Sequence, residues 1–490
     1  MIQLPKNLKE RFGSRCTDSR FECSFYGRDV AYIPPFLVRL LTRPVPDMVF
    51  RPLCAEEVSE IIAFAGRRRL AVTPRAGGST ALGSCVPVKA GIVIDLNGLK
   101  GVLGFEAGKE KVKVLPGTTW AELDGYLRRR GYCVRSYPSS FHVATIGGWL
   151  SGGGCGVGSL RYGPLVNQVS SLEVVLPSGE IRRVTRHSQP CVSWFAAAEG
   201  TLGVITGVEL KVRTLPEATR HFLLASKEPG GLFEAARDCA RGLAHPVYNL
   251  HYNSRSLNWA LQTGGLAPEP LGRYHTLAVS LEGTPTDLDR AGESIWSMVK
   301  GYGLTMLDDS LALEEWENRF RLLRIRRLYP SLLACELLVP TASCQQYLEE
   351  VENLGRQAGV RMLTYAHIIS RDQALVMTLY YSDEGNPFRY LCDASLTARI
   401  YRTGCRLGGG PYTIGFWNTP YLHLQKIHHP DRLQELRQRK LLLDPQGILN
   451  PGKVYGPTPL LSPVLFGIGL KAAGFLRVFL HERVRCDGWE

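Results

Sequence analysis

The sequence predicts an α+β fold with more than one domain. Between about residues 45 and 215, amphipathic helical segments alternate with short apolar segments that are typical of strands. Between 216 and 400, blocks that suggest a strand followed by a helix continue, but glycine clusters become fewer. The 490 residues are enough for roughly three domains, since a domain usually has about 150 residues.

The elements of the first region are marked by periodicity and by turn residues. A helix is predicted over 56–69, where Val58, Ile61, Ile62 and Ala65 share one face. A second helix is predicted over 119–131, with Thr119 as its N-cap and a glycine as its stop. Apolar segments predict strands at 70–74, 90–96, 112–117 and 201–212, and a hairpin around Pro-Ser-Gly at 169–184.

The second region has the same two kinds of element. Residues 275–283 are typical of a strand, and residues 345–359 and 432–445 are typical of helices. A further glycine-rich segment, RLGGGPYTIGFWN, covers 406–418. We therefore expect a second α+β domain after residue 215.

Composition and charge limit the ligands, the cysteine-based sites and the cellular compartment that we expect for this protein. Lys and Arg exceed Asp and Glu by 58 − 45 = 13, which suits an anionic ligand, an acidic partner, a membrane surface or nucleic acid. The 13 cysteines include no CxxC pair, which argues against a disulfide scaffold, a zinc ribbon or an iron–sulfur cluster held by this chain alone. The first residues contain no apolar signal sequence, so we expect a cytoplasmic protein.

A glycine-rich loop follows the first predicted strand. It reads PRAGGSTALG and covers residues 74–83. Gly77 and Gly78 can adopt positive φ and let a ligand approach the backbone, while Ser79 and Thr80 add hydroxyl donors and Arg75 adds positive charge. The loop could hold a pyrophosphate, although it matches neither GxGxxG nor the P-loop, and a plain glycine turn is the alternative.

Two later segments extend this pattern. Residues 138–163, PSSFHVATIGGWLSGGGCGVGSLRYG, place Thr145, Ile146 and Trp149 among many glycines, which favours backbone packed against a flat ligand over a flexible linker. Residues 199–212, EGTLGVITGVELKV, predict a turn that leads into a strand.

Together with LLDPQGILNPGK at 442–453, these motifs resemble the FAD-dependent superfamily of vanillyl-alcohol oxidase, also called the PCMH type. The similarity is best to its glycolate oxidase and D-lactate dehydrogenase branch. It is dense over 45–215 and 440–453 and loose over 216–400. The resemblance implies a two-part PCMH-type FAD-binding domain and an α+β cap domain that contains an antiparallel sheet.

Domain boundaries and cofactor residues follow from the resemblance. The domains expected are an N-terminal extension at 1–44, the FAD-binding domain at 45–215, the cap or substrate domain at 216–404, a segment that closes the FAD site at 405–457 and an amphipathic tail at 458–490. The residues implied in binding FAD are Pro74, Arg75, Gly77, Gly78, Ser79, Thr80, Gly83, Pro138, Ser139, Thr145, Gly147, Gly148, Gly152, Gly203, Ile205, Asn450 and Lys453.

The resemblance also bears on how the flavin is attached. Some relatives join the flavin to a histidine at the position of Ser79, so we expect FAD to be bound here without a covalent link. His423, His428 and His429 remain as other points of attachment or as surface histidines.

The substrate domain departs from its relatives. The hydroxy-acid branch carries HxGDGNxH and GEHGxG, whose histidines and glutamate hold a divalent metal. This chain has YAHIISRDQALV and GGGPYTIGFWN, which retain His367 but lack the second histidine and the glutamate. We therefore expect no metal at the catalytic site. His367 is either a general base or an ordinary histidine of a strand.

Three residues form the predicted catalytic set: His367, Arg319 and Tyr412. The segment EEWENRFRLLRIRR at 314–327 resembles a WxxR motif, in which Arg319 would face the carboxylate of an acid substrate. The arginines that follow could equally form a solvated helix face. Tyr412 and Trp417 are candidates for walls near the isoalloxazine ring or for core residues.

The tail is unusually apolar. Over 460–485, polar residues including Lys471, Arg477 and Arg485 fall on one helical face and apolar residues fill the rest. Such a helix would lie on an anionic membrane surface or dock on another subunit, and both alternatives stay open.

The leading functional hypothesis is an FAD-dependent dehydrogenase of a 2-hydroxy acid or a similar organic anion. Electrons would pass to a quinone or to an iron–sulfur or electron-transferring flavoprotein partner. The first alternative is an electron-relay or non-catalytic subunit of a larger membrane-associated redox complex. The second is a relative of the alkyl-dihydroxyacetonephosphate synthases, whose multi-histidine stretch is missing here. Nucleic-acid binding rests on charge alone, and we expect none.

Overall fold

The computed structural model describes residues 5–31, 33–242, 247–419, 421–422, 424 and 430–454. The described chain forms two compact units. Unit 1 contains the residues up to Gly154, together with Pro164–Thr214 and the residues from Thr413 onward. Unit 2 contains Cys155–Gly163 and Leu215–Tyr412. Helices and sheets occur in both units, which confirms the predicted α+β class.

The first sheet of unit 1 has four strands in the order β1-β2-β4-β3. They are β1 (Cys16–Thr17), β2 (Met48–Phe50), β3 (Val72–Arg75) and β4 (Ile92–Asp95). Strands β2, β4 and β3 run parallel, and helix α4 (Ala55–Arg68) connects β2 to β3. Val58, Ile61, Ile62 and Ala65 of α4 are buried, as the sequence predicts for this face.

The second sheet of unit 1 is antiparallel, in the order β5-β6-β10-β8-β9, with β7 paired to the far end of β10. Its strands are β5 (Val102–Glu106), β6 (Lys111–Val114), β7 (Tyr132–Val134), β8 (Val169–Val175), β9 (Ile181–Thr185) and β10 (Val204–Thr214). The predicted hairpin is confirmed as β8 and β9, which pair in antiparallel fashion.

Short helices complete unit 1. They are α5 (Trp120–Arg128), α6 (Ile146–Gly152), α8 (Val192–Phe195) and α15 (Pro430–Leu443). Helix α5 begins after Thr119, whose hydroxyl accepts the N–H of Glu122 while the Glu122 carboxylate accepts the N–H of Thr119. This capping box confirms the predicted start. The helix ends at Arg128, three residues before the predicted glycine stop.

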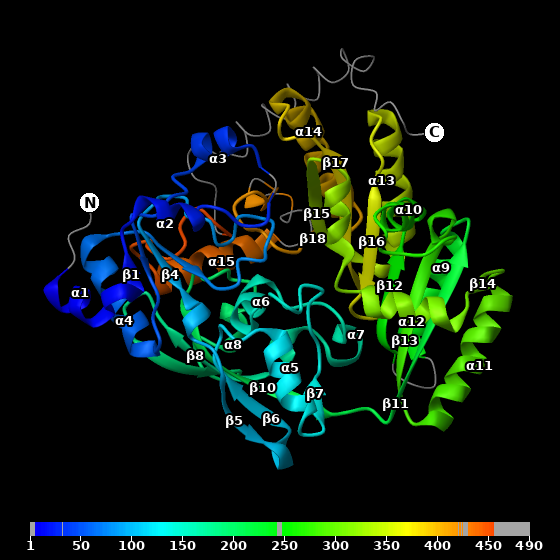
Figure 1. Ribbon diagram of the computed structural model, residues 1–490, viewed down its shortest axis with the longest axis horizontal. Coiled ribbons are helices and arrows are strands. Elements are labelled where there is room, and N and C mark those ends of the chain that lie inside the picture. The colour runs from blue at the N-terminus through cyan, green and yellow to red at the C-terminus, as the bar shows by residue number, and fades with distance from the viewer. Residues whose placement is uncertain are drawn as a thin grey trace. The chain divides into compact units, whose positions relative to one another are not determined.

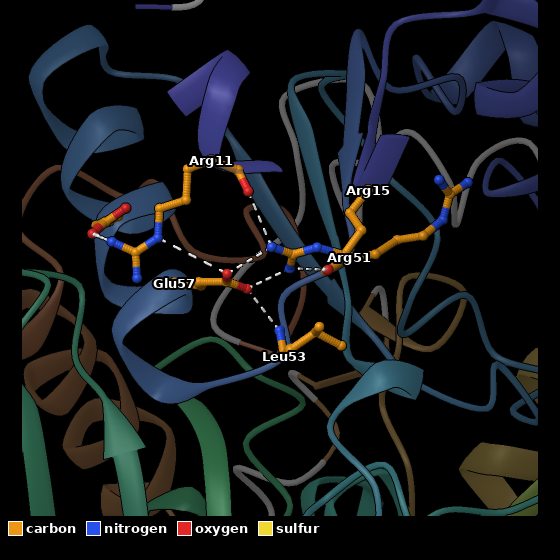
Figure 2. Close-up of polar contacts among 6 residues, drawn as sticks. Arg11, Arg15, Arg51, Leu53 and Glu57 are labelled. Carbon is orange, nitrogen blue, oxygen red and sulfur yellow. Dashed lines mark hydrogen bonds and ion pairs between the residues drawn. The ribbon is translucent and has the colours of Figure 1, made fainter. Parts of the chain in front are cut away.

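The N-terminal residues belong to unit 1. They form α1 (Lys6–Phe12), α2 (Arg20–Phe25) and α3 (Pro35–Leu41), and Leu8 and Phe12 are buried in the core that also contains α4. Figure 2 shows the polar side of this contact. The Arg15 guanidinium donates to both oxygens of Glu57, at 2.6 and 2.8 Å, and the Glu57 carboxylate also accepts the N–H of Leu53 at 2.8 Å. Arg11 pairs with Glu57 and Glu60, so the segment is tied to the first turns of α4.

Unit 2 is built on an antiparallel sheet of eight strands, in the order β14-β11-β13-β12-β16-β17-β15-β18 (Figure 1). The strands are β11 (Ala218–Ser226), β12 (Val247–Asn253), β13 (His275–Gly283), β14 (Thr305–Met306), β15 (Ser331–Pro340), β16 (Leu363–Ile368), β17 (Gln373–Ser382) and β18 (Gly410–Pro411). The antiparallel sheet that the resemblance implied for the second domain is thus present.

The helices of unit 2 are α7 (Ser159–Tyr162), α9 (Gly230–Gly242), α10 (Arg255–Thr263), α11 (Pro285–Gly301), α12 (Asp309–Asn318), α13 (Cys344–Ala358) and α14 (Pro387–Arg406). One face of the sheet packs on α9, α11, α13 and α14, through residues such as Phe222, Tyr252 and Leu337. The opposite face contacts α10 and α12, each through a separate apolar cluster. The two faces therefore have different coverings.

None of the helices in the described ranges is both long enough and apolar enough to cross a membrane. The predicted amphipathic tail and the three histidines at 423, 428 and 429 lie outside the described residues.

Candidate functional site

The glycine-rich loop after β3 presents unused backbone donors. Within the described chain, the N–H groups of Gly77, Gly78 and Ser79 donate to no other group. Gly78 has φ +59°, and a Cβ on Gly77 would lie 2.4 Å from the carbonyl oxygen of Val143. The loop can therefore adopt this shape only with glycine at both positions, and successive N–H groups line it as a site for an anion.

Arg75 binds backbone carbonyl groups of the N-terminal segment, whereas the sequence suggests that its charge serves a pyrophosphate. Its guanidinium donates to the carbonyl oxygens of Arg28, at 2.6 Å, and Tyr26, at 3.3 Å. The Asp29 carboxylate, in the same N-terminal segment, accepts the N–H of Gly83 at 2.6 Å and the N–H of Ala31 at 2.9 Å. The segment 26–31 thus holds both ends of the glycine-rich loop in place.

Two residues from the C-terminal part of unit 1 hold the loop from another side. The Asn450 amide donates to the carbonyl oxygens of Ser84, at 2.9 Å, and Glu199, at 2.6 Å. The Lys453 ammonium donates to the carbonyl oxygens of Ser84, at 2.7 Å, and Val86, at 2.6 Å. Burial lowers the pKa of Lys453 to about 8. Asn450 and Lys453, which the resemblance implies in binding FAD, therefore both contact the residues that directly follow the glycine-rich loop.

Glu199 is a buried carboxylate that the sequence analysis left without a role. Its side chain accepts the N–H groups of Ile414 and Gly415 at 2.9 Å each. A Cβ on Gly415 would lie 1.9 Å from the Leu82 carbonyl oxygen, so this turn packs tightly against the end of the loop. Burial raises the pKa of Glu199. Glu199 has φ +49°, and its place directly before the glycine of the EGTLG motif is the signal that the sequence offers.

The remaining cofactor candidates fall into two groups. Thr145 caps α6 by accepting the N–H of Gly148, and Gly147 packs against Pro116, so these residues and Gly152 share one short helix beside the loop. Gly203 differs, because a Cβ there would lie 2.9 Å from the Phe195 ring, which marks it as a packing position in the core. Ile205 is buried in β10, Pro138 is buried in a turn, and Ser139 next to it is exposed.

The residues of unit 1 fit FAD. Unused N–H groups and the hydroxyls of Ser79 and Thr80 line the glycine-rich loop, which suits a pyrophosphate. The Asn450 amide oxygen is a buried polar atom without a hydrogen-bond partner in the described chain, so a polar ligand could use it. Trp417, a candidate wall, packs with Phe416 against Gly83.

A polar strip crosses the face of the unit 2 sheet that α10 and α12 contact. Asn249, His251 and Asn253 alternate along β12, so their side chains point to one face. His367 on β16 lies directly opposite His251, and their ring centroids are 6.2 Å apart. All four residues are at most 3% exposed. Buried polar residues are rare in a sheet core, so this strip is the candidate functional face of the sheet.

Glu315 on α12 orients the centre of the strip. Its carboxylate lies 2.8 Å from His251 Nε2 and 3.5 Å from Asn253 Nδ2. Although burial opposes ionisation, these contacts hold the pKa of Glu315 below its usual range. His251 Nε2 therefore carries a proton toward Glu315, and His251 Nδ1 lies 3.0 Å from Asn249 Nδ2.

His367 and Arg319, two predicted catalytic residues, lie close to this strip. His367 Nδ1 is 3.0 Å from the Tyr365 hydroxyl, and its Nε2 has no partner in the described chain. Burial, with a smaller effect of His251, lowers the pKa of His367 to about 3. The Arg319 guanidinium lies 3.9 Å from the centroid of the Trp316 ring and 4.2 Å from that of Phe320. The Trp316 ring also stacks on His221.

Tyr412 lies apart from the other two. It follows β18, and two strands, β17 and β15, separate β18 from β16, which carries His367. Its hydroxyl accepts the N–H of Cys155 at 2.8 Å. The structure therefore gathers His367 and Arg319 with His251 and Glu315, and leaves Tyr412 at the edge of the sheet. Among the described residues, no three His, Cys, Asp or Glu side chains are placed to share a metal ion.

Sequence reasoning missed His251, Glu315 and Asn253. The alternation of polar residues in NLHYN at 249–253 was visible, but such a pattern also fits a strand with one solvated face. Glu315 directly precedes Trp316 of the WxxR-like segment. Nothing in the sequence shows that the Glu315 side chain faces a histidine more than 60 residues away.

Comparison with known proteins agrees with this geometry. The sequence matches the family described as "FAD binding domain" over residues 46–185 and that described as "FAD linked oxidases, C-terminal domain" over 215–454. It is 22% identical to the glycolate oxidase subunit GlcD of Bacillus subtilis, across 84% of this chain and 89% of the relative. It is 28% identical to a D-lactate dehydrogenase of Archaeoglobus fulgidus, across 83% and 91%.

Solved structures show the same fold. p-Cresol methylhydroxylase with substrate bound superposes with a TM-score of 0.78 at 13% identity, over 92% of this chain and 96% of that one. An alkyldihydroxyacetonephosphate synthase superposes with a TM-score of 0.73 at 18% identity, over 92% and 86%. The two family matches, the relatives and the fold lead to one conclusion: this chain belongs to the FAD-linked oxidoreductases, with an FAD-binding domain of the PCMH type, and its cofactor is FAD.

Proposed function

We propose that this protein is an FAD-dependent dehydrogenase that oxidises a 2-hydroxy acid or a similar organic anion to the 2-oxo acid. The observation that carries the proposal is the polar strip of unit 2, where imidazole, carboxylate and guanidinium groups gather on a sheet face between two apolar clusters. Relatives that are named D-lactate dehydrogenase and glycolate oxidase subunit support the substrate class.

The roles of this chain's residues follow from their chemistry. FAD, when bound, supplies a hydride acceptor for the hydrogen on the substrate's Cα. Arg319 would bind the carboxylate, because its guanidinium is planar and is positioned by contacts with the Trp316 and Phe320 rings and with the Trp316 carbonyl oxygen. His367 Nε2, which has no partner in the described chain, would take the proton of the hydroxyl. A substrate anion next to it would raise the low pKa of this imidazole toward neutrality.

We further propose that FAD is bound without a covalent link, since Ser79 replaces the histidine of some relatives. Acid precipitation tests this. Non-covalent flavin stays in the supernatant, whereas flavin in the protein pellet would contradict the proposal. We propose that the electrons leave to a quinone or to an iron–sulfur or electron-transferring flavoprotein partner.

A panel of 2-hydroxy acids tests the dehydrogenase directly. Each acid is added anaerobically to the purified holoenzyme, and the visible absorbance of the flavin is followed. Bleaching by at least one acid is expected, and Arg319→Lys should raise the acid concentration needed by tenfold or more, because an ammonium cannot make the two-pronged contact. A flavin that dithionite reduces but no acid bleaches would contradict the proposal.

The same experiment addresses a second candidate, an FAD-containing relay subunit of a larger membrane-associated complex. The observation in its favour is the pKa of about 3 for His367, which makes this imidazole a weak base before substrate binds. A relay subunit would stay oxidised with every acid and would be reduced only by its redox partner.

A further inference from the structure

Three buried polar atoms on the face of the unit 2 sheet that α10 and α12 contact have no hydrogen-bond partner in the described chain. They are Asn249 Oδ1, Asn253 Oδ1 and His367 Nε2. Their residues are 1%, 3% and 3% exposed. An unpaired buried polar group is destabilising, so three on one face point to a ligand that completes them.

The orientation of the Asn253 amide is set by charge. The ionised Glu315 carboxylate can only accept hydrogen bonds, and it lies 2.8 Å from His251 Nε2. Asn253 therefore directs its Nδ2 toward Glu315, which leaves its oxygen as a free acceptor. Asn249 Nδ2 lies 3.0 Å from His251 Nδ1, and Asn249 Oδ1 has no partner in the described chain.

The three atoms belong to one continuous surface. Asn249, His251 and Asn253 are two residues apart along β12, and His367 is the cross-strand neighbour of His251. They form a row with an imidazole near its centre and an amide oxygen toward each end. A ligand that satisfies the row must carry several polar groups, spaced along its length.

Hydroxyl groups match this row best. A hydroxyl can donate to an amide oxygen, and it can either donate to or accept from an imidazole nitrogen in whichever tautomer is present. A cationic ligand would call for a carboxylate, and the Glu315 carboxylate is already paired with His251. An alkyl chain would leave the oxygens unpaired in a dry environment.

We propose that the natural substrate is a polyhydroxylated 2-hydroxy acid, of the aldonic acid type, and that Asn253 binds a hydroxyl group beyond C2. This inference rests on the proposed dehydrogenase function. It makes Asn253 a specificity-determining residue, whereas Arg319 and His367 would serve any 2-hydroxy acid.

The test compares acids of equal chain length. Gluconate and galactonate are paired with both enantiomers of 2-hydroxyhexanoate, and anaerobic flavin reduction is measured for each with the wild-type holoenzyme. We expect kcat/KM for at least one aldonate to exceed that for hydroxyhexanoate by tenfold or more, because a site built to bind hydroxyls discriminates strongly against analogues that lack them.

Two variants test whether Asn253 causes the preference for aldonate. Asn253→Leu keeps the size and shape of the side chain but removes its polar group, so the ratio of kcat/KM for aldonate to that for hydroxyhexanoate should fall by at least tenfold. Asn258→Leu is the matched control. Asn258 is also buried, but its amide is satisfied by the Tyr274 carbonyl and the Thr276 hydroxyl, at 2.9 Å each. Its substitution should lower thermal stability and leave the ratio as it is.

Each outcome is decisive. Equal or better use of hydroxyhexanoate by the wild-type protein overturns the polyhydroxylated substrate and leaves the dehydrogenase function standing. An Asn253→Leu protein that retains FAD with an unchanged ratio also overturns it. If Asn253→Leu fails to fold, the wild-type ratio decides alone. If no acid bleaches the flavin while dithionite does, the dehydrogenase function fails and this inference fails with it.

Discussion

Three ionisable side chains shape the loop that we assign to the FAD pyrophosphate. Asp29, Glu199 and Lys453 each bind backbone groups of the loop, of the chain after it or of the turn packed against it. Glu199 and Lys453 are buried and Asp29 is half-buried, and polar groups removed from water are costly unless they are hydrogen-bonded, as all three are. These residues therefore act on the cofactor through the backbone that they hold.

Glu199→Gln tests this view at the scale of one residue. A glutamine oxygen at the Oε1 position can still accept the N–H groups of Ile414 and Gly415, but its NH₂ then takes the Oε2 position and faces the N–H of Gly415. We expect the free energy of unfolding to fall by about 1–3 kcal/mol and FAD to be released faster. Thermal unfolding and the appearance of free flavin fluorescence measure the two effects.

Glu180→Gln is a suitable control for that substitution. Glu180 lies on the hairpin between β8 and β9, and its side chain is 49% exposed in a surface pair with Arg182. Because such pairs contribute little, its replacement should change neither property measurably. Equal effects of the two substitutions would contradict the role given to Glu199.

At the scale of elements, the sheet of unit 2 carries an unusual number of buried histidines. Burial lowers the pKa of His221 and of His275 to about 4, and the pKa of His367 to about 3. In the unfolded chain these groups titrate near 6.5. The unfolded state therefore binds more protons between about pH 4 and 6.5, and folding stability must fall as the pH is lowered through this range.

His275→Gln isolates one part of this effect. His275 lies at the start of β13, where its Nδ1 accepts from the Tyr252 hydroxyl at 2.5 Å, and a glutamine oxygen can replace that acceptor. Between pH 7 and pH 5 the wild-type protein should lose about 2 kcal/mol more stability than the variant.

Urea unfolding at the two pH values measures the difference. His187→Gln, on the exposed turn after β9, serves as the control and should follow the wild type. The interpretation would be wrong if His275→Gln and the wild type lost the same stability on acidification.

At the scale of the whole molecule, contacts within the fold account for some of the basic residues behind the net charge of +13, but not for all of them. Several arginines of unit 1, such as Arg15 and Arg75, are used within the fold. We propose that the basic residues predicted on one face of the 460–485 tail bind an anionic surface, either a membrane or an acidic subunit.

Deletion of residues 458–490 tests the assignment of the tail. The residues that we place around FAD end at Lys453, so the shortened protein should keep its flavin. It should lose binding to vesicles that contain phosphatidylglycerol, because electrostatic attraction and the burial of apolar residues are both removed. Sedimentation with such vesicles, with neutral phosphatidylcholine vesicles as the control, gives the answer. Loss of flavin on truncation would show that the tail belongs to the cofactor site.

The sequence alone determined the family, the cofactor and most elements. Glycine is needed wherever backbone approaches a ligand or another strand, so the loop at 74–83 and the tract at 138–163 leave a readable pattern. Helix α4 and the hairpin β8–β9 could be predicted because their periodicity and turn residues are local properties of the chain.

Only the tertiary structure decided how the side chains are used. Arg75 was expected to serve a phosphate, yet it holds the carbonyl groups of a segment almost 50 residues earlier. His251 and Glu315 meet because β12 and α12 pack together in unit 2, and no local pattern encodes that pairing. Backbone conformation is largely set by neighbouring residues, whereas the partners of a buried charge or amide come from distant parts of the chain, and so they appear only once the chain is folded.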